Sequence, residues 1–153
     1  GYNNNMQLFQ TTDHVVILNE MVHDTRVVPL DGRPHLAGVR QWAGDARGHW
    51  EGDTLVVESH NFTDRTASFD PGATAGLGSG ETLHLTERFT RVDDDTLLYE
   101  YTVDDPATFT RPFTVALPMR KSEGAVFEYA CHEGNYGLMN ILRGARVDEA
   151  SVR

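Results

Sequence analysis

One short stretch near the carboxyl end gathers three side chains that could do chemistry. The sequence YACHEGNY places the only cysteine of the chain beside a histidine and a carboxylate, at Cys131, His132 and Glu133. A thiolate activated by an imidazole is a nucleophile, but side chains adjacent in sequence rarely reach each other in that way. A strand is expected to end near Cys131, so His132 and Glu133 are candidates for an acid–base site at a strand-to-helix junction.

A second candidate is a carboxylate inside a strand-like run. In LHLTERF, side-chain alternation places Glu87 on the apolar face, and in the following run Tyr99 and Tyr101 share one face. A carboxylate between phenols would suit a general base or a ligand anchor, with Tyr101 or Tyr99 orienting it. The alternative is a structural ion pair between Glu87 and an arginine such as Arg26 or Arg111.

Histidines supply the candidate metal ligands. His23, His84 and His132, together with Glu87 or Glu133, are the ligand types that Cu, Zn and Fe use. The sequence has no HxH, HExxH or CxxC pair, so an unrelated scatter of seven histidines is the alternative. If a metal cofactor is bound, histidine-rich ligation favours Cu or Zn.

Two tryptophans are candidate ligand contacts. Trp42 and Trp50 flank the segment AGDARGH, where an exposed indole could stack on a sugar or an aromatic ligand. The alternative is that they plug the end of a barrel.

The elements that must position these side chains are short strands joined by tight turns. Turn signals recur at Thr12-Asp13, Glu51-Gly52-Asp53, Asp93-Asp94-Asp95 and Ser122-Glu123-Gly124, between runs rich in β-branched and aromatic residues. This spacing predicts an all-β fold, an antiparallel meander closed into a lipocalin-like (calycin) barrel of eight to ten strands. A jelly-roll sandwich is the alternative.

The chain is expected to form a single domain over residues 1–146. Leu138, Met139, Ile141 and Leu142 predict a short C-terminal helix that could cover a barrel end, and residues 147–153 a frayed tail. The segment 66–81 is rich in Gly, Ala and Ser, which predicts a long loop, either a lid over a cavity or a plain surface loop.

Charge and composition narrow the partners. The 153 residues carry a formal net charge of −10, with 13 basic side chains scattered along the chain, which argues against nucleic acid and acidic polymers. No apolar run is long enough for a membrane helix. Neutral glycans, small organic molecules and cations stay open, and so does a homodimer. The chain begins at Gly1 without a signal peptide, which favours a trimmed or mature form.

Three stretches resemble a known family. They are LDGRPHLAGVRQWAGDARGHWEGDTLVVESHNFTD (30–64), LHLTERFTRVDDDTLLYEYTVDDP (83–106) and FEYACHEGNYGLMNIL (127–142), and they are similar to the C-terminal region of uncharacterised secreted bacterial proteins. The resemblance implies a secreted or periplasmic location. It also implies a structural role for Cys131. The family's extra N-terminal segment often has its own cysteine, which would be a natural partner for Cys131. The family has no established activity, so it assigns no catalytic residue.

Together these observations favour an exported enzyme that acts on a small organic or carbohydrate substrate at a barrel mouth. Glu87, His23, Tyr101, His132 and Glu133 would handle protons, with a metal as a further option. A non-catalytic binding barrel, lined by Tyr99, Trp42 and Trp50, is the first alternative. An accessory domain of a larger secreted protein is the second.

Overall fold

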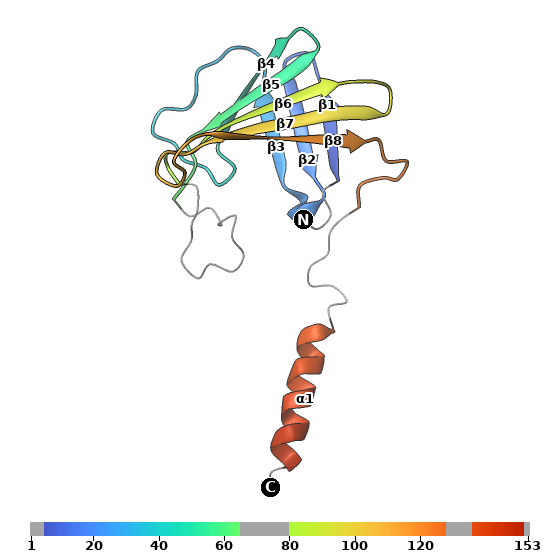
Figure 1. Ribbon diagram of the computed structural model, residues 1–153. Helices are drawn as coiled ribbons and strands as arrows, with labels where there is room; N and C mark the ends of the chain where they lie inside the picture. Colours follow the sequence, from blue (N-terminus) through green and yellow to red (C-terminus); the bar gives the residue numbers. More distant parts are fainter. Residues whose placement is uncertain (1–4, 65–79, 128–135, 152–153) are drawn as a thin grey trace.

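The computed structural model describes residues 5–64, 80–127 and 136–151. In this part of the chain, eight strands form two antiparallel sheets, followed by one α-helix (Figure 1). The predicted β-rich antiparallel architecture with a C-terminal helix is therefore confirmed. No helix in the described residues is both long enough and apolar enough to cross a membrane.

The smaller sheet has three strands in the order β1-β2-β3. They span β1 Met6–Gln10, β2 His14–Asn19 and β3 Thr25–Pro29. Between β2 and β3 the chain reverses through a 3-10 turn, Met21–His23, in which His23 has a positive φ of 44°. Strand alternation does not continue from Asn19 to His23, because the chain leaves the sheet at Asn19 to make this reversal.

The larger sheet has five strands, and their order in the sheet follows the sequence. They span β4 Asp45–Glu51, β5 Thr54–His60, β6 His84–Arg91, β7 Thr96–Asp104 and β8 Phe113–Arg120. The predicted turn between β4 and β5 contains two residues, and its first residue, Gly52, has a φ of 60°. Glycine at this position suits a type II′ hairpin turn. The predicted Asp93–Asp95 turn joins β6 to β7.

The two sheets pack face to face, with their strands running in different directions (Figure 1). β3 lies against β4, whereas β1 and β8 are each paired on one side only among the described strands. The described strands thus form an open sandwich, and closure into a barrel is not seen in them. Each sheet is a plain meander and has no Greek-key crossover of the kind that a jelly roll needs.

The main apolar core lies between the sheets. The smaller sheet contributes Val15, Ile17 and Val28, and the larger sheet contributes Ala46, Leu55, Val57 and Phe89. Gly48 allows close approach at the junction of β3 and β4. A Cβ atom added at Gly48 would lie 2.7 Å from Leu30 Cδ2 and 2.8 Å from Val28 Cγ1. The inward faces follow the alternation that the sequence predicted for β6 and β7.

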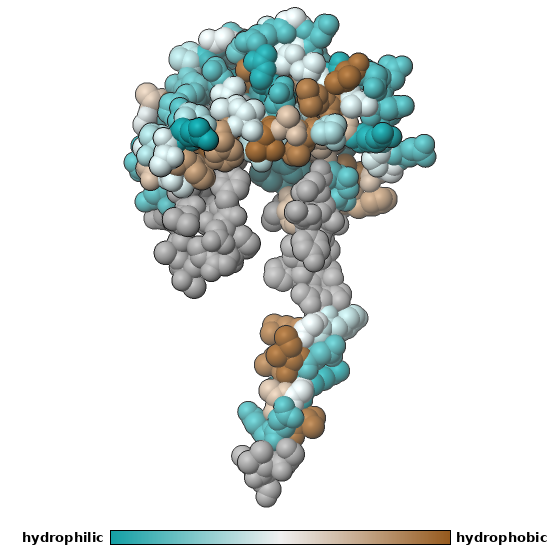
Figure 2. All heavy atoms as spheres, viewed as in Figure 1, coloured by the Kyte–Doolittle hydropathy of each residue, from teal (hydrophilic) through white to brown (hydrophobic). Residues whose placement is uncertain are grey.

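Helix α1 spans Gly137–Ser151 and lies apart from both sheets (Figure 1). Its described side chains are exposed, so it does not cover an end of the sandwich. Figure 2 shows apolar side chains at the surface of this helix. Leu138, Met139, Ile141 and Leu142 in its first half are exposed. The helix extends to Ser151 and so includes most of the residues expected to form the tail, because 147–151 contains no glycine or proline to end it.

Several predicted features lie outside the described residues. They are residues 66–79 of the proposed lid at 66–81, and the segment 128–135, which includes Cys131, His132 and Glu133. Residues 125–127, expected to begin a strand after β8, form none.

Candidate functional site

A buried ion pair joins the two sheets. Arg26 on β3 donates from Nη1 to Glu87 Oε2 at 2.5 Å and from Nη2 to Oε1 at 2.9 Å. The Glu87 side chain, in the middle of β6, is 1% exposed and the Arg26 side chain 13%. The sequence offered Arg26 as one of two ion-pair partners, and the structure selects it over Arg111. The paired groups neutralise each other in a place where a lone charge would be costly.

Tyr99 completes this arrangement. Its hydroxyl donates to Glu87 Oε1 at 2.7 Å, whereas the neighbouring Tyr101 ring lies 5.6 Å from the Tyr99 ring, centroid to centroid. Burial raises the pKa of Tyr99, and the adjacent Glu87 carboxylate raises it further, so the phenol keeps its proton and stays a donor. Glu87 therefore accepts three hydrogen bonds from described residues, and this fixes the position of the Tyr99 ring.

The Tyr99 ring stacks on Phe89, with the two centroids 4.9 Å apart. Next to this stack, at the end of the sandwich where three hairpin turns meet, is a hollow of about 170 Å³. Its inner surface is apolar and comes from both sheets, through Leu8, Val15, Leu55, Phe89 and Leu97. The ion pair thus supports the Tyr99–Phe89 stack beside the hollow. The Glu87 carboxylate itself does not line the hollow.

The hollow opens into a wider, shallow bowl of about 640 Å³. The two share Trp50 and Asp53, which come from the end of β4 and from the turn that follows it, as well as Gln10 and Arg91. Asp93 and Asp94 complete the bowl from the β6–β7 turn. Trp50 is 46% exposed and forms part of the wall. The arrangement is an apolar hollow with a polar rim, which is the usual composition of a small-molecule site.

The two tryptophans predicted as ligand contacts are not brought together. Trp42 precedes β4 and is 65% exposed, whereas Trp50 is near the other end of that strand. Of the two, Trp50 alone lines the hollow. Tyr99 lies just beyond the hollow, and Tyr101 packs with a second apolar cluster around Leu83 and Val103.

The predicted histidine ligands are also separated. His23 is exposed on the turn between β2 and β3, and His132 lies outside the described residues. His84 instead packs edge-to-face against His60, with centroids 4.2 Å apart, and His60 packs in the same way against His35 at 4.4 Å. Within the described ranges, no group of three or more His, Cys, Asp and Glu side chains is arranged to hold a metal ion.

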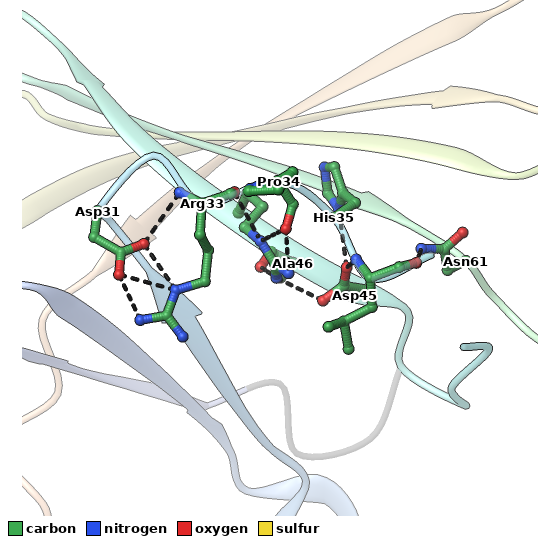
Figure 3. A network of polar contacts seen from close by, with 9 residues as sticks. Asp31, Arg33, Pro34, His35, Asp45, Ala46 and Asn61 are labelled. Atoms are coloured by element: carbon green, nitrogen blue, oxygen red, sulfur yellow. Dashed lines mark hydrogen bonds and ion pairs between the residues drawn. The ribbon is translucent and has the colours of Figure 1, made fainter. Parts of the chain in front are cut away.

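One member of this row, His35, belongs to the loop between β3 and β4. This loop folds over the outer face of β4 and β5. Figure 3 shows the loop attached through Asp45, which accepts from Leu36 N at 2.7 Å and from His35 Nδ1 at 3.2 Å. Arg47 bonds the other Asp45 oxygen at 2.5 Å and also donates to the carbonyl of Pro34. Burial favours a higher pKa for Asp45, but these hydrogen bonds outweigh it and lower the pKa. The network is structural, because each of its polar groups already has a partner within it.

His60 has an altered protonation equilibrium. Burial lowers its pKa from the usual 6.5, and the neighbouring His84 and His35 lower it further. Of this row, only His84 was predicted from the sequence as a metal ligand. The contact between His35 and His60 depends on how the loop that carries His35 packs on β5, which the sequence pattern does not show. The same limit applies to the hollow, whose lining comes from six strands and the β4–β5 turn.

No family model, no curated protein and no solved structure matches this chain. The resemblance to uncharacterised secreted bacterial proteins therefore stays a prediction, and the function must be argued from the geometry of the site.

Proposed function

We propose that this domain binds a small, largely apolar organic molecule in the hollow beside Trp50. The observation that carries the proposal is the hollow of about 170 Å³ at one end of the sandwich, where the edge of the apolar core, with side chains from both sheets, forms its lining. Burying such surface against a ligand is worth about 25 cal/mol per Å². The outer bowl provides room for a polar group that stays in contact with water.

The lining favours an apolar ligand over a neutral glycan. A sugar needs several hydrogen-bonding groups around it, whereas the inner hollow presents Leu8, Val15, Leu55, Phe89 and Leu97. Trp50 could stack on either kind of ligand. The polar groups of the site are confined to the rim, so they would orient one end of the ligand and leave its body among the apolar side chains.

Binding is favoured over catalysis by the condition of Glu87. Its carboxylate is 1% exposed, is held by Arg26 and Tyr99, and is absent from the lining of the hollow. A general base needs direct or water-mediated access to the substrate. We therefore assign Glu87 the role of fixing the Tyr99–Phe89 stack, and we give the domain a carrier or sensor role within an exported protein. Closure of the sheets into a lipocalin-like barrel would place the hollow at the mouth of that barrel.

The test is a titration with 4-phenylbutanol, a neutral amphiphile with an apolar body, followed by the two tryptophan indole N–H signals in ¹H–¹⁵N NMR spectra. Trp42→Phe and Trp50→Phe variants assign the two signals. We expect the Trp50 signal to shift saturably and the Trp42 signal to stay in place. Saturable shifts at Trp42 alone, or binding of cellobiose in preference to the alcohol, would overturn the proposal.

A matched pair of variants tests the location of the ligand. Leu97 lines the hollow, whereas Leu98, its neighbour on β7, points to the opposite face of the sheet. Leu97→Phe fills part of the hollow and should weaken binding about fivefold, equivalent to roughly 1 kcal/mol. Leu98→Phe should leave the affinity unchanged. Equal effects of the two variants would contradict binding in the hollow.

A further inference from the structure

We infer that the ligand of this hollow is an organic cation, an amine or quaternary ammonium group carried on an apolar body. This inference rests on the proposed function, because it concerns the same hollow. It adds only that the charged rim selects ligands by their charge. The apolar body would occupy the inner hollow, and the charged group would lie in the outer bowl beside Trp50 and Asp53.

The rim carries more negative than positive charge. Three carboxylates line the bowl, from Asp53, Asp93 and Asp94, against one guanidinium, from Arg91. Arg91 already donates from Nη2 to Asp94 Oδ1 at 3.1 Å and from Nε to the carbonyl of Asp93 at 3.2 Å. The backbone N–H of Asp95 and the hydroxyl of Thr96 lower the pKa of Asp93, which keeps its carboxylate ionised. Arg120 also acts on Asp93 from outside the bowl and helps to lower its pKa. Among the lining residues themselves, carboxylates outnumber guanidinium groups, which disfavours an anionic ligand.

Asp53 is the carboxylate best placed to meet a cation. It lines both the inner hollow and the outer bowl, which Asp93 and Asp94 do not. Among the described residues, no hydrogen bond or ion pair engages its side chain. The turn that holds it is a two-residue hairpin, so the position of Asp53 relative to Trp50 is fixed by the pairing of β4 with β5.

Trp50 supplies the second attraction. An indole face attracts an ammonium group through its negative quadrupole, and the attraction grows as water is displaced. Trp50 lines both compartments and is 46% exposed, so part of the ring is open to an incoming group. The whole chain has a formal charge of −10, which also raises the local concentration of cations and disfavours anions.

Three probes with the same body separate this inference from the proposed function. 4-Phenylbutylamine, 4-phenylbutanol and 4-phenylbutyrate carry positive, zero and negative charge at pH 7 on one phenylbutyl group. Each is titrated at low ionic strength, with the Trp50 indole signal as the readout. We expect the amine to bind about fivefold tighter than the alcohol, and the carboxylate to bind more weakly than both. The preference for the amine should shrink at 0.5 M salt.

Two single-charge variants provide the matched comparison. Asp53→Asn should reduce the amine-to-alcohol affinity ratio to about two or less and leave the affinity for the alcohol unchanged. Asp104→Asn removes the same charge at an exposed site on the outer face of the larger sheet, and should leave the ratio unchanged. Asparagine suits turns, so the Asp53 variant should keep its fold, which the NMR spectrum would verify.

The outcomes separate the two claims. Binding of the alcohol without tighter binding of the amine would overturn the cation inference and leave the proposed function standing. A ratio lowered equally by both variants would also overturn it, because it would show a non-specific effect of net charge. Failure of all three probes to shift the Trp50 signal would overturn the proposed function itself.

Discussion

Arg26 of the three-stranded sheet and Glu87 of the five-stranded sheet form a two-bond ion pair across the interior, with distances of 2.5 and 2.9 Å. It is a polar contact across a largely apolar interior, and it supports the Tyr99–Phe89 stack next to the hollow. The pair therefore connects the stability of the sandwich to the shape of the proposed site.

Removing one member of this pair should be far worse than removing both. Arg26→Met leaves the Glu87 carboxylate buried without its charge partner and should cost about 3–5 kcal/mol in the free energy of unfolding. The double variant Arg26→Met/Glu87→Leu should recover most of that loss, because no buried charge is left. Urea denaturation of the single and double variants measures the coupling. Additive losses would show that the pair is not coupled as described.

Gly48 should tolerate no larger side chain. Gly48→Ala would bring a methyl group to 2.7 Å from Leu30 and 2.8 Å from Val28, where the β3 and β4 strands meet. We expect a loss of about 1–3 kcal/mol in the free energy of unfolding. Gly144→Ala is the matched control, because a Cβ at this helical position meets nothing within 4 Å. Equal stability of the two variants would contradict the close approach.

Acid should weaken the fold through His60. Its pKa in the folded chain lies below the unfolded value of 6.5, so its contribution to stability is present above pH 6.5 and is lost as the pH falls through the folded value. His60→Gln should therefore reduce the drop in unfolding free energy between pH 7.5 and pH 5. His49→Gln, outside the histidine row, is the control. Asp45, Glu58, His35 and His84 face the same region and stay unchanged in both variants. An unaltered pH profile for His60→Gln would refute this prediction.

Deleting the helix should leave the sandwich intact. The described side chains of α1 are exposed, so the helix contributes little buried surface to the sheets. A chain ending at Tyr136 should unfold at the same urea concentration as the full chain, within about 0.5 kcal/mol. A loss of several kcal/mol would show that α1 packs on the sheets in solution.

Strand alternation was sufficient to predict the inward faces of β6 and β7. It placed Glu87 and Tyr99 on the apolar side and named Arg26 among two partners for the carboxylate. It could not choose between Arg26 and Arg111, because that choice depends on how one sheet packs on the other. Periodicity within a strand has no information on that packing.

The hollow could not be predicted for a similar reason. Trp50 and Asp53 are close in sequence, but Leu8 and Leu97 reach the same place from strands far along the chain. The histidine row shows the same limit, since His35 meets His60 only because its loop is attached to Asp45. Contacts within one hairpin follow from local pattern, whereas contacts between sheets and loops need the packed fold.

The central claim is that an apolar ligand occupies the hollow between the sheets. The most direct measurement is a set of intermolecular NOEs between the aromatic protons of bound 4-phenylbutanol and the methyl groups of the isotopically labelled protein. We expect NOEs to the methyl groups of Leu8, Val15, Leu55 and Leu97, which line the hollow from both sheets. NOEs confined to the exposed methyl groups of α1, such as those of Leu138 and Ile141, would contradict binding in the hollow.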